Sequence, residues 1–144
     1  EKNIGETGGV YYTSSRNISE LNGLVSKVSA SGSGGDCEEN DLEALIKGTK
    51  LAKPFDHLVL IADSNSPVRD LELLSKLTTP VHVILCGYED FILNDYLKIA
   101  WKNKGSIHTI EEDIVNIYRM LEGQNITIDS KTYTLMGGEF ITLN

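Results

Sequence analysis

The feature that most constrains this 144-residue chain is an apolar run, Leu58–Ala62, that ends at Asp63. Apolar residues without a polar break are typical of a strand buried on both faces, as central strands of parallel sheets are. Ser66 and Pro67 follow, and they indicate a helix start, because Ser caps free N–H groups and Pro fits the first helical position. We therefore expect Asp63 between a strand end and a helix start, which is the ligand side of an open α/β sheet.

Strand and helix patterns alternate from residue 57 to residue 122. Unbroken or alternating apolar residues predict strands, and apolar residues at helical spacing predict the helices between them. The expected strands span 9–13, 57–62, 81–87 and 106–110, and the expected helices span 18–29, 42–51, 67–77, 95–103 and 111–122. This order predicts a three-layer, Rossmann-like, mostly parallel sheet with helices on both faces and right-handed crossovers.

Several residues indicate where these helices begin and end. Asn17 with Glu20, and Thr109 with Glu112, match the capping box, in which two side chains each bind a free N–H group of the first turn. Gly105 follows the 95–103 helix, and we expect it to end that helix in a left-handed conformation.

The last part of the chain changes from alternating helices to short strands. Ile126–Ile128 and Thr132–Leu135 flank Asp129–Lys131, which predicts a β-hairpin, and Phe140–Leu143 predicts a further strand. We therefore expect a partial α/β domain over 1–122 and a C-terminal β extension over 123–144 that packs on the same domain.

Charge and cysteine content restrict the classes of partner. A net charge of −8 argues against a nucleic acid or an anionic membrane surface. No apolar run approaches the ~20 residues of a membrane helix, and no secretory signal opens the sequence. Cys37 and Cys86 match no zinc or redox spacing, so we expect free thiols and favour a cytoplasmic location.

Two short carboxylates are the candidate metal ligands. In a parallel sheet, Asp63, the Asp36 loop and the strand end at Cys86–Gly87 approach the same edge. Carboxylate oxygens are the ligands that Mg²⁺ prefers, and Mn²⁺ or Ca²⁺ are alternatives. The other interpretation is that both aspartates only cap a turn or a helix. His57, His82 and His108 each lie early in a strand and are expected to be packing or rim residues away from Asp63, with no nucleophile partner readable from the spacing.

Two stretches together resemble the von Willebrand factor A family. Gly34–Leu45 looks like the family's second metal-site segment, and Leu58–Asp63 looks like the strand that carries its third metal-site aspartate. The resemblance covers residues 9–122 and implies a doubly wound sheet with a metal-ion-dependent adhesion site. It implies that Asp36 and Asp63 are metal ligands. The expected rim of this site comprises Ser64, Asn65, Cys37, Gly35 and Gly87.

One departure from the family shapes the expected function. The family's first segment, Asp-x-Ser-x-Ser at the end of a first strand, is absent, so we expect a domain entered partway. Strand 57–62 then has an unpaired edge and an uncovered apolar flank, which predicts a homo-oligomer or completion by another chain. The expected function is a non-catalytic protein–protein interaction module with a partial, weak divalent-metal site. The alternatives are a hydrolase-like or phosphoryl-transfer enzyme using Asp63, and a structural fragment whose activity lies outside this chain.

Overall fold

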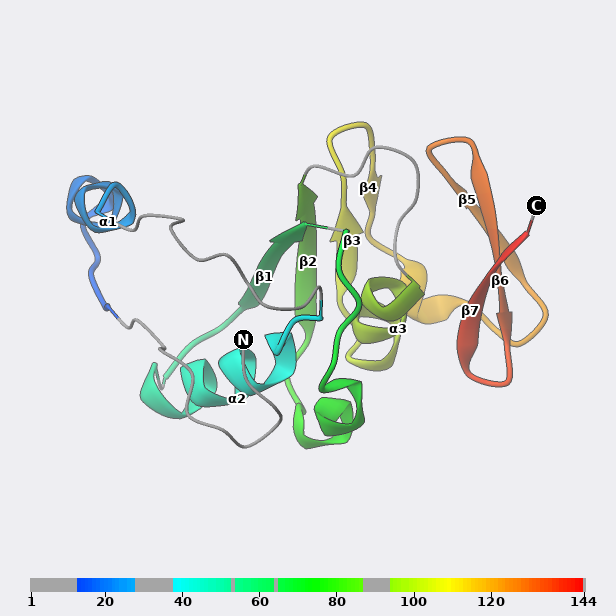
Figure 1. Ribbon diagram of the computed structural model, residues 1–144, viewed down its shortest axis with the longest axis horizontal. Helices are drawn as coiled ribbons and strands as arrows, with labels where there is room; N and C mark the ends of the chain where they lie inside the picture. Colours follow the sequence, from blue (N-terminus) through cyan, green and yellow to red (C-terminus); the bar gives the residue numbers. More distant parts are fainter. Residues whose placement is uncertain (1–12, 28–37, 53, 64, 87–93, 144) are drawn as a thin grey trace.

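The chain forms an α/β structure with one mixed, mostly parallel sheet and a separate antiparallel sheet (Figure 1). It is seen in a computed structural model that describes residues 13–27, 38–52, 54–63, 65–86 and 94–143. The first sheet has the strand order β1-β2-β3-β4. Its strands are β1 (Leu58–Asp63), β2 (Val81–Cys86), β3 (Ser106–His108) and β4 (Asp113–Ile114). The first three are parallel, as expected, and β4 runs antiparallel to β3.

One face of this sheet carries the hydrophobic core. Leu60, Val83 and Ile107 lie opposite one another in register, and all three are buried. The elements that pack around this face are α2 (Asp41–Leu51), the 3₁₀ helix η1 (Leu71–Lys76), α3 (Asn94–Lys102) and the 3₁₀ helix η2 (Ile117–Arg119). Fully buried Tyr96 and Leu97 bring the buried side of α3 into the same core.

The opposite face, which we call the open face, is not covered by the described helices. Val59 and Ile61 of β1 are 47% and 68% exposed, and Ile84 of β2 is also exposed. The expectations of a β1 strand buried on both faces and of helices on both faces are therefore wrong for the described residues. The steps from β1 to β2 to β3 all move one way across the sheet, so right-handed crossovers place both connections on the same face.

The helix expected over 67–77 is shorter and tighter than the spacing predicted. Val68 is not helical, because it forms a parallel bridge with Glu39 and donates its N–H to the Asp95 carboxylate at 3.0 Å, and Arg69 and Asp70 form a turn. Only the 3₁₀ helix η1 (Leu71–Lys76) remains of it, with Leu73 and Leu74 buried. The helix start indicated by Ser66 and Pro67 is thus overridden by tertiary pairing.

The helix expected over 111–122 is wrong. Thr109 Oγ1 does accept from the N–H groups of Glu111 and Glu112, as a cap would. However, the Thr109 N–H donates to the Glu112 carbonyl, and the chain turns back so that Ile107 pairs with Ile114 in β4. Pairing with β3 therefore determines the conformation of this segment, although its apolar residues have helical spacing.

Gly105 follows α3 for a different reason from the one expected. The left-handed residue is Lys104, with φ 55°. A Cβ on Gly105 would lie 1.7 Å from the carbonyl oxygen of Val81, so only glycine lets β3 start this close to β2. The 95–103 helix itself is confirmed as α3.

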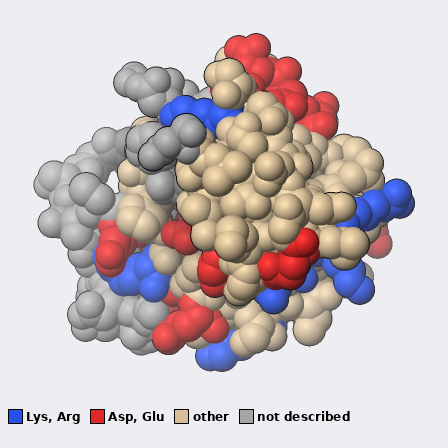
Figure 2. Space-filling model, turned by 90° about the vertical axis from the view of Figure 1, so that its right-hand side faces the viewer, with Lys and Arg blue, Asp and Glu red and all other residues tan. Residues whose placement is uncertain are grey.

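The expected hairpin and final strand are confirmed as an antiparallel sheet of β5 (Asn125–Ile128), β6 (Lys131–Met136) and β7 (Glu139–Leu143). Both turns have positive φ at two residues, Asp129–Ser130 and Gly137–Gly138, which matches the twist of paired strands. This sheet packs on α3 through an edge-on contact of Phe140 with Trp101 and an ion pair of Glu139 with Lys98. Figure 2 shows that this side of the molecule presents a broad uncharged area with both acidic and basic side chains around it.

The helix α1 (Ile18–Val25) buries no residue and lies apart from both sheets (Figure 1). Asn17 caps it as expected, accepting from the Ser19 N–H at 2.9 Å, whereas Glu20 binds the Ser15 hydroxyl instead of completing a capping box. The strand expected over 9–13 falls almost wholly outside the described residues. No helix in the described ranges is long and apolar enough to cross a membrane.

Candidate functional site

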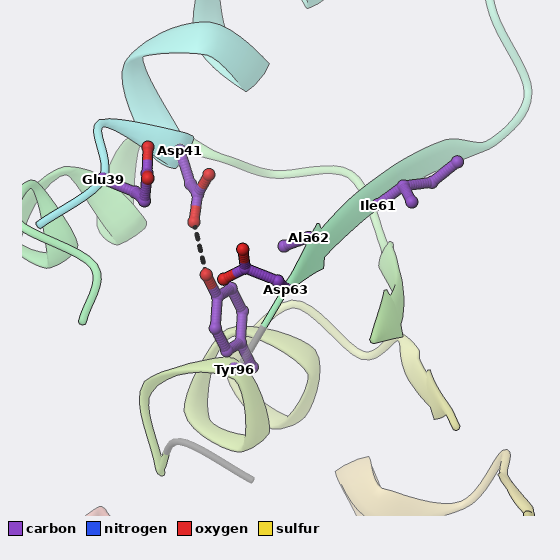
Figure 3. A pocket seen from close by; sticks show the side chains of 6 residues that line it. All are labelled: Glu39, Asp41, Ile61, Ala62, Asp63 and Tyr96. Atoms are coloured by element: carbon purple, nitrogen blue, oxygen red, sulfur yellow. Dashed lines mark hydrogen bonds between the residues drawn. The ribbon is translucent and has the colours of Figure 1, made fainter. Parts of the chain in front are cut away.

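A small acidic cleft lies at the carboxyl end of β1 (Figure 3). Its volume is about 160 Å³. Three carboxylates, one phenol and two apolar side chains form its walls: Glu39, Asp41, Asp63, Tyr96, Ile61 and Ala62. The cleft therefore joins the end of the open face to the first turn of α2, which is where an open α/β sheet binds its ligands.

Backbone pairing brings Glu39 to this cleft. The Glu39 N–H donates to the Pro67 carbonyl at 3.0 Å, and the Arg69 N–H donates to the Glu39 carbonyl at 2.8 Å. Arg69 also binds Glu38 through its Nε, at 3.1 Å from Oε2, and through a bond to the Glu38 carbonyl. The segment after Cys37 is thereby held beside the segment that follows β1.

Asp70 positions the other acidic residue of this segment by capping α2 from a distance. Its carboxylate accepts from the N–H groups of Leu42, at 3.1 Å, and Glu43, at 2.6 Å, in the first turn of the helix. The side chain has no exposed surface, and burial raises the pKa of the Asp70 carboxyl, while the two N–H groups offset part of that rise. With α2 fixed in this way, Asp41 points into the cleft.

Tyr96 forms the floor of the cleft and holds Asp41. Its ring is fully buried in α3, and its hydroxyl donates to Asp41 Oδ2 at 3.0 Å (Figure 3). Burial raises the pKa of the Tyr96 phenol, and the nearby negative charges of Asp41, Asp63 and Glu39 raise it further. The phenol therefore stays protonated and acts as a hydrogen-bond donor at the base of the cleft.

Asp63 lies at the mouth of the cleft, where it caps a turn, as one of the two interpretations from the sequence expected; the metal-ligand interpretation stays a prediction. Its Oδ1 accepts from the Asn65 N–H at 3.2 Å, which is an Asx turn, and its carboxylate points toward Tyr96 (Figure 3). The neighbouring strand ends in register at Cys86, a free and exposed thiol. Asp63 thus ends a strand, shapes a turn and lines a cleft.

The other expected site residues cannot be placed in this way. Asp63 and Asn65 lie together, as the sequence indicated, but the rest fall outside the described residues: Asp36, Ser64, Cys37, Gly35 and Gly87. Sequence reasoning missed Glu39, Asp41 and Tyr96. Acidic residues at a helix start commonly complement the helix dipole, so Glu39 and Asp41 give no sign of a site by themselves, and no local signal indicates that a tyrosine of α3 meets them.

The described carboxylates match only part of a divalent-metal site. Glu39, Asp41 and Asp63 supply the oxygen ligands that Mg²⁺ prefers. Within the described ranges, however, no three His, Cys, Asp or Glu side chains group closely enough to hold a metal ion. The described residues alone do not complete such a site.

The three histidines lie away from this cleft, on the open face. His82 is opposite Ser106 in register, and His108 is two residues further along β3, so their side chains share the face that Val59 and Ile61 occupy. His57 is exposed, whereas His82 and His108 are half-buried. His82 and His108 also each form a hydrogen bond with Ser106, at 2.7 Å. The spacing gave no sign of this pairing with a hydroxyl.

Comparison with known proteins adds no relative to this picture. No protein-family model matches the chain, and no curated protein or solved structure matches it either.

Proposed function

We propose that this chain is a non-catalytic protein-interaction module of the von Willebrand factor A type that binds a partner strand along β1 and a positive group in the acidic cleft. The observation that carries the proposal is the state of β1. It ends the sheet within the described residues, and it exposes 68% of Ile61 directly beside the carboxylates of the cleft. An exposed apolar edge strand is a template for pairing with another chain.

The order of elements supports the family type in this proposal. Three parallel strands follow one another with η1 and α3 between them, and an acidic segment precedes α2 beside the end of β1. This is the order that the resemblance implies for the second half of the family domain. Asp36, proposed as a second ligand, precedes Glu39 by three residues in the same segment.

The chemistry of the cleft favours a positively charged group. Three carboxylates line the cleft, and Ile61 supplies an apolar wall on which the aliphatic part of a lysine or arginine can lie. A divalent cation, Mg²⁺ first, with Mn²⁺ or Ca²⁺ as alternatives, supplies the same charge and recruits an acidic residue of the partner, as the resemblance implies. The two sources of charge are distinguishable by experiment.

A second copy of this chain is the partner we propose first. Antiparallel pairing of two β1 strands about a two-fold axis brings Val59 and Ile61 of both copies onto a shared surface. Such pairing also places Asp63 of one copy near the start of β1 in the other, where His57 lies. Unlike charges then meet at both ends of the paired strands when His57 is protonated.

Sedimentation of the wild type and two matched variants tests this partner. We expect concentration-dependent dimers for the wild type, monomers for Ile61→Lys, and unchanged dimers for Ile141→Lys, since Ile141 is an exposed isoleucine on the other sheet. A wild type that remains monomeric at every concentration rejects the second copy and leaves a different protein as the partner.

Calorimetry with Mg²⁺ and Mn²⁺ tests the source of positive charge. We expect weak binding that Asp63→Ala abolishes and that Asp56→Ala, an exposed aspartate before β1, leaves intact. Absence of metal binding in the wild type assigns the cleft to a basic side chain. The enzymatic alternative has less support, because the described residues that line the cleft include no histidine or lysine to assist Asp63. Turnover of a phosphoester or acyl ester would overturn the non-catalytic proposal.

A further inference from the structure

Four polar side chains form a continuous hydrogen-bonded chain across the open face. His82 Nδ1 lies 2.7 Å from Ser106 Oγ, which lies 2.7 Å from His108 Nε2. His108 Nδ1 lies 2.6 Å from Asp113 Oδ1. The strand register builds this chain directly, because His82 pairs with Ser106 and His108 pairs with Asp113.

The donors in this chain follow from the chemistry of its ends. An ionised Asp113 can only accept, so His108 Nδ1 carries a proton. When His108 is neutral, its bare Nε2 accepts the hydroxyl proton of Ser106. Ser106 Oγ then accepts from His82, whose proton must lie on Nδ1. Every bond has one proton, and all of them are donated toward Asp113.

One proton added to His108 reverses the first two bonds. A protonated His108 donates from Nε2 to Ser106 Oγ, and the hydroxyl proton turns toward His82. His82 can accept it only through a bare Nδ1, so its own proton lies on Nε2 instead. A second added proton would leave both rings donating to the same oxygen with like charges on each side of it, which is unfavourable.

We propose that His82, Ser106, His108 and Asp113 form a single pH-sensitive switch on the open face of the sheet. Proton uptake at His108 sets the tautomer of His82 through the hydroxyl of Ser106, although the two rings share no hydrogen bond of their own. The switch changes the charge and the exposed donor of this face in one step. It does not depend on the partner proposed for β1.

Ser106, His108 and Asp113 are linked in the order of a serine-hydrolase triad, but the exposure of the serine and the aspartate is the reverse of what catalysis needs. Ser106 is 4% exposed, whereas the side chain of Asp113 is 72% exposed. A nucleophile must be reachable by substrate, and the carboxylate of a triad is buried. The acidic cleft also lies at the far end of β1, away from this serine. These facts favour proton uptake over acyl transfer.

The ionisable groups that face this chain come from the residue before β1 and from β1, β2 and β4. His57, which precedes β1, stacks at a tilt with its ring centroid 5.8 Å from that of His82. Asp113 comes from β4, while Asp63 and Cys86 lie on the same face at the far ends of β1 and β2. Of these groups, Asp113 is the one that bonds directly to His108.

Ring-nitrogen NMR shifts of the three histidines, followed from about pH 5 to pH 8, test the switch. In the wild type we expect the His82 tautomer to change with the same midpoint as proton uptake by His108. In Asp113→Asn, where the amide no longer carries the charge to which His108 bonds, the change of the His82 tautomer should move in pH together with proton uptake by His108.

Substitution of the hydroxyl completes the test. Ser106→Ala should uncouple the two midpoints, Ser106→Thr should restore the coupling, and Ser75→Ala, an exposed serine of η1, should change neither. Circular dichroism verifies that each variant is folded. The proposal is overturned if Asp113→Asn moves the His108 signal alone. Covalent labelling of Ser106 by an activated phosphonate would also overturn it, because it would show a nucleophile instead.

Discussion

The two faces of the β1–β4 sheet are built by the same strands and differ in what they contact. Leu60 and Ile61 are consecutive residues of β1, yet one is 8% exposed in the core and the other is 68% exposed. The same alternation separates Val83 from Ile84 on β2. The covered face therefore holds the fold together, and the open face carries apolar and titratable groups that the described fold does not use.

This difference teaches that apolar character alone does not locate a core. A strand that is covered on both faces usually has an apolar sequence throughout. The sequence of β1 has this character, but the described elements cover only one of its faces. The exposed apolar side chains on the open face are the basis for the proposed partner. The polar chain on that face is a separate property, and the two can be tested apart.

The largest expected effect compares the two faces within one strand. Leu60→Ala should lower the free energy of unfolding by about 2–4 kcal/mol, because it leaves a cavity in the core. Ile61→Ala, one residue later, should change it by no more than about 0.5 kcal/mol. Urea unfolding of dilute protein measures both values. An equal decrease in the free energy of unfolding for both variants would show that the open face is covered in solution, and the two faces would then not differ as described.

A smaller effect is expected from Asp70→Asn, beneath the covered face. The amide cannot accept both N–H groups of α2, so the variant should lose about 1–3 kcal/mol. Because burial raises the pKa of Asp70 above its unfolded value, its titration contributes stability that is full below the unfolded pKa and is lost as pH rises through the folded pKa. The advantage of the wild type over Asp70→Asn should therefore shrink as pH rises.

Unfolding curves at several pH values between about 4 and 8 measure this trend. An advantage that grows with pH would mean that the two N–H groups outweigh burial and hold the pKa of Asp70 below its ordinary value. Asp56→Asn, an exposed aspartate before β1, is the matched control and should show no comparable loss.

Tyr96→Phe should have a more modest effect where the core meets the cleft. It keeps the buried ring but removes the hydroxyl that donates to Asp41, at a cost of about 1 kcal/mol. Tyr118→Phe, on an exposed side chain, should cost less than half as much. Thermal unfolding of both variants provides the comparison, and equal losses would show that the Asp41 bond contributes nothing.

The smallest effect is expected from Asp63→Asn at the end of the open face. The amide oxygen can still accept from the Asn65 N–H, so stability should change by less than about 0.5 kcal/mol. Binding of a positively charged group should weaken all the same, because one of three carboxylates has lost its charge. A large loss of stability would place Asp63 in the fold rather than in the site.

The sequence predicted those parts of the fold that depend on local signals. The unbroken run of β1, the helical spacing of α3 and the turn residues of the β5–β7 sheet each indicate their own element. The errors came where distant residues decide. Pairing of Glu39 with Val68 prevents a helix at Pro67, and pairing of Ile107 with Ile114 replaces the helix expected after Thr109.

The candidate site was predictable to a similar extent. Asp63 was found because an apolar strand ending in a carboxylate marks the ligand edge of a parallel sheet. Tyr96 and Asp41 are 55 residues apart in the chain and meet only once α2 and α3 have packed. The chain of His82, Ser106 and His108 needs the register of β2 against β3, which no single segment contains.

The capping of α2 by Asp70 has a consequence for anyone who selects variants of this protein. Asp70 and Arg69 do not line the acidic cleft, yet they fix the segment that carries Glu39 and Asp41. A library screened for altered binding at the cleft should therefore recover changes at these two positions as well as at the lining residues. Their variants would alter affinity by moving an intact wall, so that chemically unchanged carboxylates would meet the ligand at new distances.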